Sequence, residues 1–269
     1  MAAASCRASR VVFSLISLTM MTMNRRYSSE IAKLVDLESF DPRAFLAADK
    51  PTQACCDFVL ALALVFNDIK GVLLGDSLLL GETPKDRVTP TTELGAFAGS
   101  HLQAFRILLG VVHELLYLVK AEKTTRESPC FKGVVRNLPK ATRTAWEKLV
   151  QASEADVSSD EDVRFLVIAR NTVAYHYGTK AIGRGFRRAF GSLSERPFLS
   201  RGSSISTTRF YFADRAAQSS LQLTFGEDDL ENYFLKKNPE LIEGIAFALF
   251  TIVTGFITSR GCSWRNGVI

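Results

Sequence analysis

Apolar residues recur at the spacing of α-helices along most of the chain. They fall every three to four positions from Gln53 to about Leu80 and from Thr92 to about Lys123, and both stretches are too long for β-strands. Shorter stretches of the same kind cover Ala141 to Ser153 and Arg164 to Ala181, and an almost wholly apolar stretch covers Leu241 to Ser259. The pattern predicts a mostly α protein built as a helical bundle.

Segments of different composition separate these predicted helices. Residues 81–92 and 128–139 are polar and contain prolines, so we expect connections there. Arg209–Phe212 and Ser220–Phe225 have the composition of strands, so we expect a small β-hairpin beside the bundle. The predicted organisation is a leader at 1–29, a connecting segment at 30–51, a bundle at 52–260 with a basic and aromatic insertion at about 180–235, and a tail at 261–269.

The leader contains four arginines, no acidic residue and an apolar stretch from Val11 to Leu18. These features are typical of a targeting segment, although the small-residue cleavage site of a secretory signal does not follow the apolar stretch. The alternative is a start codon assigned too early, because further methionines stand at 20, 21 and 23. Both interpretations stay open, and both exclude the leader from the fold.

The last predicted helix raises the question of a membrane. A helix needs about 18 to 20 apolar residues to cross a bilayer. The run from Ile245 to Ile257 is shorter, and the helix also contains Glu243, Thr251 and Thr254. We therefore expect a central helix of the bundle, and a membrane-associated helical protein is an alternative.

Charge and cysteine content bear on partners and location. The chain has 33 basic and 28 acidic residues, a net charge of +5, which favours anionic partners. Between Lys180 and Arg209 there are seven basic residues and one acid, Glu195. The five cysteines and three histidines show no metal-ligand spacing, so we expect a reduced cytoplasmic protein without a structural zinc site.

One short motif combines two groups that suit phosphate chemistry. Arg170 stays charged and can hold a phosphate with two hydrogen bonds, and His176 is the side-chain type that exchanges a proton near neutral pH. Arg170-Asn171 followed by His176, with apolar and aromatic residues between them, resembles the signature of the HEPN family of all-helical domains. Asp68 and Lys70, in the first long helix, resemble polar residues that this family often places there, and a salt bridge inside the bundle is their alternative role.

The resemblance implies a helical bundle that commonly forms a homodimer and, in many members, a metal-independent endoribonuclease of defence or toxin systems. In the implied mechanism the RNA 2′-hydroxyl attacks the adjacent phosphate, His176 transfers a proton, and Arg170 stabilises the developing charge. Asn171 would orient the phosphate or the partner helix. No metal and no cofactor are implied, and the expected partners are RNA, a second copy of the chain and an antitoxin or regulatory protein.

Basic residues after the motif are the expected RNA contacts, since phosphate contacts supply most of the affinity for RNA. They are Lys180, Arg184, Arg187 and Arg188. The aromatic residues among them suit either base stacking or core packing. We expect Gly183 and Gly185 to provide flexibility and to end a helix.

Other interpretations of these residues remain open. Arg170 and His176 could serve as a surface charge and a hydrogen-bonded core histidine, and structural roles are also expected for His101 and His113. The alternative function is a non-catalytic helical module that binds nucleic acid or a protein.

Overall fold

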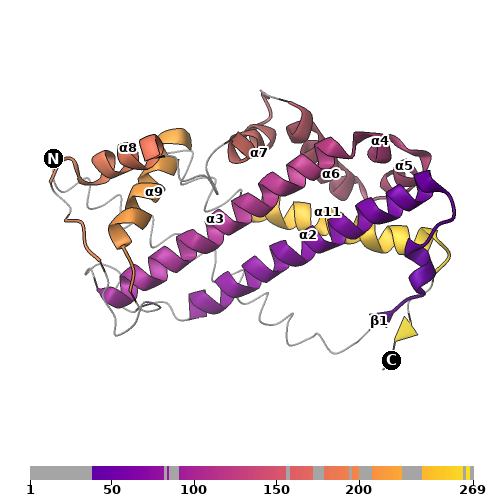
Figure 1. Ribbon diagram of the computed structural model, residues 1–269, viewed down its shortest axis with the longest axis horizontal. Coiled ribbons are helices and arrows are strands. Elements are labelled where there is room, and N and C mark those ends of the chain that lie inside the picture. Colours follow the sequence, from indigo (N-terminus) through magenta and orange to yellow (C-terminus); the bar gives the residue numbers. More distant parts are fainter. Residues whose placement is uncertain are drawn as a thin grey trace. The chain divides into compact units, whose positions relative to one another are not determined.

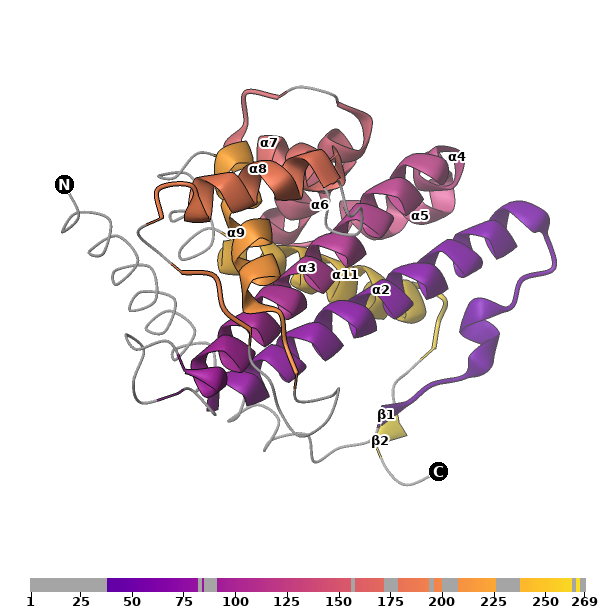
Figure 2. The ribbon, with the colours of Figure 1, turned by 60° about the vertical axis from the view of Figure 1, so that its left-hand side comes forward.

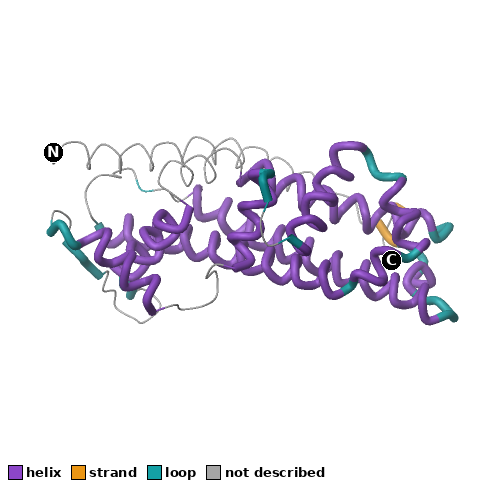
Figure 3. The backbone as a smooth tube through the Cα atoms, turned by 90° about the horizontal axis from the view of Figure 1, so that it is seen from above, coloured by secondary structure: helices purple, strands orange, loops and turns teal. Residues whose placement is uncertain are grey.

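The computed structural model describes residues 38–81, 84, 91–155, 158–171, 179–193, 196–199, 208–225, 238–262 and 265–266. Helices dominate this part of the chain (Figures 1 and 3). They are η1 (Pro42–Phe45, a 3-10 helix), α2 (Lys50–Gly81), α3 (Thr92–Ala121), α4 (Lys123–Glu127), α5 (Pro129–Arg136), α6 (Lys140–Glu154), α7 (Glu161–Asn171), α8 (Thr179–Phe190), α9 (Tyr211–Phe225) and α11 (Asn238–Ser259). Two short strands, β1 (Glu38–Ser39) and β2 (Arg265–Asn266), pair antiparallel. The prediction of a mostly α protein is confirmed.

Side-chain caps fix where the helices begin. The Asp49 carboxylate accepts a hydrogen bond from the backbone N–H of Thr52, at 2.8 Å, in the first turn of α2. The Thr91 hydroxyl accepts one from the N–H of Leu94, at 3.0 Å, at the start of α3. Asp160 accepts from the N–H groups of Asp162 and Val163, so α7 begins at Glu161 and not at Arg164. Each carboxylate or hydroxyl satisfies a donor that the first turn leaves without a helical partner.

The chain divides into two compact units, and both boundaries fall within long helices. The first unit combines the described parts of residues 72–107 and 173–239. The second combines the described parts of residues 31–71, 108–172 and 240–269. Helices α2 and α3 therefore each contribute to both units.

Aromatic side chains fill the centre of the second unit. The ring of Phe131 lies 5.1 Å from that of Phe58 on α2 and 5.4 Å from that of Trp146 on α6. Phe131 belongs to α5, in the segment expected to be a connection, so that expectation is wrong. Pro129 occupies the first turn, where its missing N–H costs nothing, and the Ser128 hydroxyl accepts from the N–H of Phe131. Proline here starts a helix instead of breaking one.

In the first unit, α8 crosses α9 at close range (Figure 2). A Cβ at Gly185 would lie 2.0 Å from the carbonyl oxygen of Ala216 and 2.7 Å from the backbone nitrogen of Ser220. Only glycine allows this approach. The expectation that Gly183 and Gly185 end a helix is therefore wrong, since both lie inside α8.

The expected hairpin at 209–225 does not form. Residues Tyr211–Phe225 are helix α9. Its buried residues Ala216 and Ser219 stand at i and i+3, and the backbone of Ala216 and Ser220 lies against Gly185 of α8. Packing against α8 outweighs the strand-like local composition, as strand propensity depends strongly on context.

Three helical stretches are long and apolar enough to cross a membrane, by length and composition. They are Lys50–Asp76, Thr92–Ala121 and Glu240–Ser259. The length argument against a membrane helix at the end of the chain therefore does not hold. One side of α11 does pack in the core, where Ile245, Leu249 and Ile252 are fully buried.

Candidate nucleic-acid interface

The residues of the Arg-Asn…His motif stand at the end of α7 and beyond it. Arg170 and Asn171 are the last two residues of this helix. Their side chains, and residues 172–178 with His176 among them, lie outside the described residues. The expected single helix over 164–181 is replaced in the described residues by the end of α7 at Asn171 and the start of α8 at Thr179.

Basic side chains gather on one side of α8. Lys180, Arg184 and Arg187 stand at i, i+4 and i+7, a spacing that places them on the same side of a helix. All three are exposed, and α8 contains no acidic residue. We call these three residues the cationic side of α8.

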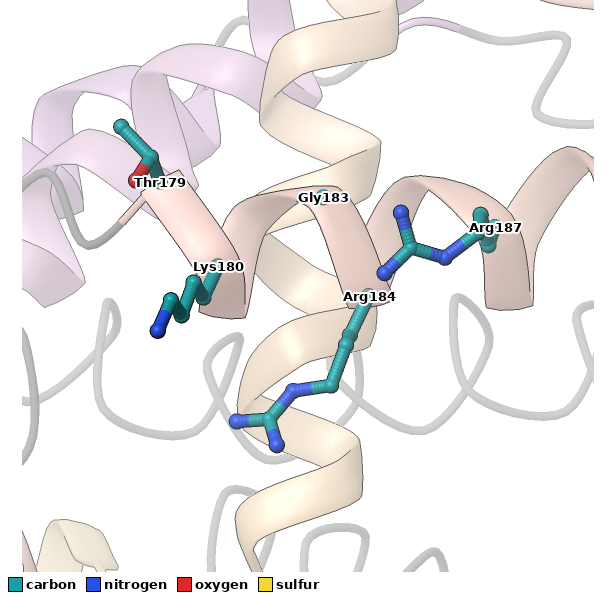
Figure 4. A pocket seen from close by; sticks show the side chains of 5 residues that line it. All are labelled: Thr179, Lys180, Gly183, Arg184 and Arg187. Atoms are coloured by element: carbon teal, nitrogen blue, oxygen red, sulfur yellow. The ribbon is translucent and has the colours of Figure 1, made fainter.

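Together with Thr179 and Gly183, the cationic side of α8 lines an open concavity of about 430 Å³. Figure 4 shows the side chains of Lys180 and Arg184 pointing to the same side of the helix. The guanidinium of Arg187 turns back along the helix, and its Nη1 lies 3.5 Å from the position that a Cβ at Gly183 would occupy. Three cations thus border one solvent-open space, and Lys and Arg side chains are the groups that neutralise the phosphates of a nucleic acid.

The cationic side of α8 matches the spacing of a nucleic-acid strand. At a rise of about 1.5 Å per residue, Lys180 and Arg187 are separated by about 10 Å along the helix axis. In a DNA duplex each strand carries a phosphate about every 3.4 Å along the helix axis, so this length covers about three phosphates of one duplex strand. Arg188 is also exposed and adjoins the cationic side, but it has an interaction of its own.

A row of aromatic rings adjoins the cationic residues in the first unit. The ring of Phe186 lies 4.8 Å from that of Phe190 and 6.4 Å from that of Phe212, and Phe212 lies 5.7 Å from Phe210. Phe190 is only 4% exposed, whereas Phe210 is 58% exposed. The sequence left two roles open for these aromatic residues, base stacking and core packing, and the exposure of the rings separates them. Phe190 packs in the core, and Phe210 presents a ring to solvent.

Asp68 and Lys70, the two polar residues predicted in the first long helix, lie on α2 in the second unit. Asp68 is exposed, Lys70 is half-buried with an interaction of its own, and Ile69 between them is fully buried.

A histidine–carboxylate pair in the first unit was not predicted. The His101 Nδ1 on α3 lies 2.7 Å from the Asp76 Oδ1 on α2, and the ring of Phe97 stacks on the imidazole. Both side chains are mostly buried. The pair fits the structural role expected for His101, but its partner stands 25 positions away in sequence, so no local pattern could reveal it. Among the described residues, no three His, Cys, Asp or Glu side chains are placed to hold a metal ion.

Comparison with known proteins gives no relative. No family model matches the chain, and neither a curated protein nor a solved structure shows significant similarity to it. The resemblance carried by Arg170, Asn171 and His176 therefore stays a prediction.

Proposed function

We propose that this chain is a metal-independent endoribonuclease of the HEPN type, acting in a defence or toxin system in the cytoplasm. The observation that carries the proposal is the cationic side of α8, which begins at Lys180, four residues after His176 in the sequence. Four residues span at most about 14 Å of chain. A strand bound along Lys180, Arg184 and Arg187 therefore passes within reach of the histidine.

The proposed reaction needs only groups that the motif supplies. The RNA 2′-hydroxyl attacks the adjacent phosphorus while His176 transfers a proton, and the bond from phosphorus to the 5′-oxygen breaks. Arg170 stabilises the negative charge that develops on the phosphate oxygens, and Asn171 orients the phosphate or the partner helix. The products are a 2′,3′-cyclic phosphate and a 5′-hydroxyl.

The exposed ring of Phe210 supports single-stranded RNA as the substrate. Proteins that bind single strands combine a basic groove along the backbone with aromatic rings on which unpaired bases stack. The cationic side of α8 provides the first element, and Phe186 and Phe210 provide the second. Paired bases would not be available to these rings.

A non-catalytic nucleic-acid-binding module is the alternative, because the same cationic side supports binding without cleavage. Incubation of the full chain with single-stranded RNA separates the two functions. The nuclease proposal predicts cleavage that continues in excess chelator and leaves 2′,3′-cyclic phosphate ends. Binding without cleavage would favour the module. An antitoxin or regulatory protein is a proposed partner only if the chain is a nuclease.

Membrane association is a second candidate function, favoured by the exposure of α2. Only 22% of the most apolar part of its Lys50–Asp76 stretch is buried. Asp57, Asn67 and Asp68 are nevertheless exposed on this helix, and polar groups are costly inside a bilayer. Recovery of the full chain without detergent would count against this candidate.

A further inference from the structure

Two cysteines from distant parts of the sequence meet in the second unit. Cys55 lies on α2 and Cys130 lies on α5. The ring of Phe58, one turn after Cys55, lies 5.1 Å from the ring of Phe131, which follows Cys130 directly. The two helices therefore pack together at this level, and the thiol of Cys55 hydrogen-bonds with that of Cys130. We call Cys55 and Cys130 the α2–α5 thiol pair.

The neighbouring cysteine on α2 faces a different element. Cys56 is as deeply buried as Cys55, but its thiol lies 3.9 Å from the carbonyl oxygen of Ala44 in η1. Adjacent side chains stand about 100° apart around a helix, so the two thiols face different neighbours. The thiol of Cys262 contacts backbone carbonyl groups. Among the described cysteines, the fold thus selects Cys55 as the thiol partner of Cys130.

The two members of the α2–α5 thiol pair differ in their access to solvent. Cys55 is 0% exposed, whereas Cys130 is partly exposed. Burial raises the pKa of the Cys55 thiol, and the hydrogen bond with Cys130 raises it further. Cys55 is therefore the protonated partner, and its S–H donates to the sulfur of Cys130. A dissolved oxidant meets Cys130 first, with a second thiol directly behind it, and this is the arrangement of cysteines that sense oxidants.

We propose that the α2–α5 thiol pair is a redox site at which a peroxide converts two thiols into a disulfide. In the first step the sulfur of Cys130 attacks one oxygen of hydrogen peroxide and the O–O bond breaks. The departing oxygen takes the proton of Cys130 and leaves as water, so that Cys130 becomes a sulfenic acid. In the second step the sulfur of Cys55 attacks the sulfenic sulfur, the S–O bond breaks, and the leaving hydroxide takes the proton of Cys55 as a second water. The two sulfur atoms lose two electrons, and hydrogen peroxide gains them.

Oxidation at this site is compatible with a reducing cytoplasm, because cytosolic disulfides are typically transient and serve to sense oxidants. Thiol reductants return the pair to two thiols by thiol–disulfide exchange. The disulfide would tie α5 to α2 within the second unit. The redox site does not rest on the proposed nuclease activity, since neither cysteine belongs to the Arg-Asn…His motif or to α8.

Peptide mapping of the full chain after treatment with hydrogen peroxide tests the site. Trypsin cleaves after Arg126 and Lys132, so Cys130 comes out in a peptide without another cysteine. In the folded protein this peptide should be joined by a disulfide to the peptide that contains Cys55. In urea the same treatment should join it to several cysteines, because the unfolded chain no longer selects a partner. The same mixture of links from folded and from unfolded protein would overturn the proposal.

Alanine variants identify the partner thiol, because the tryptic peptide of Cys55 also contains Cys56. Cys56→Ala is the matched control, since it removes the adjacent and equally buried thiol, and its link to Cys130 should form as in the unsubstituted protein. Cys55→Ala should lose the link. Its Cys130 should instead react with dimedone, which captures sulfenic acids, and should proceed to the sulfinic acid that dithiothreitol does not reduce. A link to Cys130 that persists in Cys55→Ala would overturn the assignment of the pair.

Cys130→Ser provides a second variant at a position outside the core. After peroxide treatment its Cys55 should stay a free thiol, because the buried thiol does not meet the oxidant directly. This variant decides the question if circular dichroism shows that Cys55→Ala has lost its helical signal. In the unsubstituted protein dithiothreitol should restore both thiols. An unmodified Cys130, a link between two chains in place of a link within one, or oxidation of Cys55 in Cys130→Ser would each contradict the proposal.

Discussion

Gly185 shows how a single residue decides the packing of the unit that carries the cationic side. The positions of Ala216 and Ser220 leave no room for a side chain at residue 185. Gly183, two residues earlier in α8, has ordinary contact distance to its nearest neighbour, Arg187. The two glycines of one helix therefore have different roles.

Gly185→Ala is expected to destabilise the protein by about 1–3 kcal/mol, because the added methyl group overpacks the α8–α9 contact. Gly183→Ala should be neutral or stabilising by up to about 1 kcal/mol, because alanine is the better helix former. Urea unfolding followed by circular dichroism measures both. Equal midpoints for the two variants would show that α8 and α9 are not in close contact.

Asp160 gives the protein a specific sensitivity to acid. Hydrogen bonds from the backbone N–H of Val163 and from Lys148 hold the pKa of this carboxyl below its usual value. The folded carboxylate therefore binds a proton less readily than the unfolded one. Its contribution to stability is complete above the unfolded pKa and is lost as pH falls through the lowered folded pKa.

Asp160→Asn keeps a capping oxygen but removes the titrating group. We expect the melting temperature of this variant to fall less than that of the unsubstituted protein between pH 6 and pH 3. The comparison requires thermal unfolding at several pH values. An identical pH dependence in the two proteins would show that Asp160 does not contribute to the loss of stability in acid.

At the scale of elements, the cationic side of α8 should give RNA binding a defined salt dependence. For single strands, each neutralised phosphate contributes about 0.7 to the slope of log K against log salt. Replacing Lys180, Arg184 and Arg187 by alanine should therefore lower the slope by about 2. Replacement of the exposed residues Lys132, Arg136 and Lys140 removes the same charge elsewhere and is the control. Equal slopes in the two triple variants would make the cationic side ordinary solvated surface.

The helices were predictable where the sequence pattern is long. Apolar spacing located α2, α3, α6 and α11 because each buries one side over several turns. It failed for α5, where Pro129 was interpreted as a break although it opens the first turn. It failed again for α9, because the fit of Gly185 against this helix depends on residues about 30 positions apart.

The candidate site was predictable only in part. The i, i+4, i+7 spacing of Lys180, Arg184 and Arg187 is in the sequence, but their place on a helix became clear only from the structure. The His101–Asp76 contact and the exposure of Phe210 depend on tertiary packing. No local pattern contains that information.

At the scale of the whole molecule, basic side chains are exposed in both units of the chain, but only those of α8 adjoin an exposed aromatic ring in the proposed interface. The cationic side of α8 and the exposed ring of Phe210 belong to the first unit, and the exposed basic residues Lys132, Arg136 and Lys140 belong to the second. RNA binding should therefore respond to substitutions in the first unit and not to loss of the same charge in the second.

The central claim is that Arg170 and His176 cleave RNA. The most direct measurement is the single-turnover cleavage rate of single-stranded RNA by His176→Ala and Arg170→Ala, in excess chelator. His176→Ala should lose about 10²–10⁴ in rate, and Arg170→Ala should lose about 10²–10³. His113→Ala and Arg164→Ala are the matched controls and should cleave normally, with 2′,3′-cyclic phosphate ends. Full activity of either motif variant, or a requirement for a divalent metal, would contradict the nuclease assignment and leave the binding module in its place.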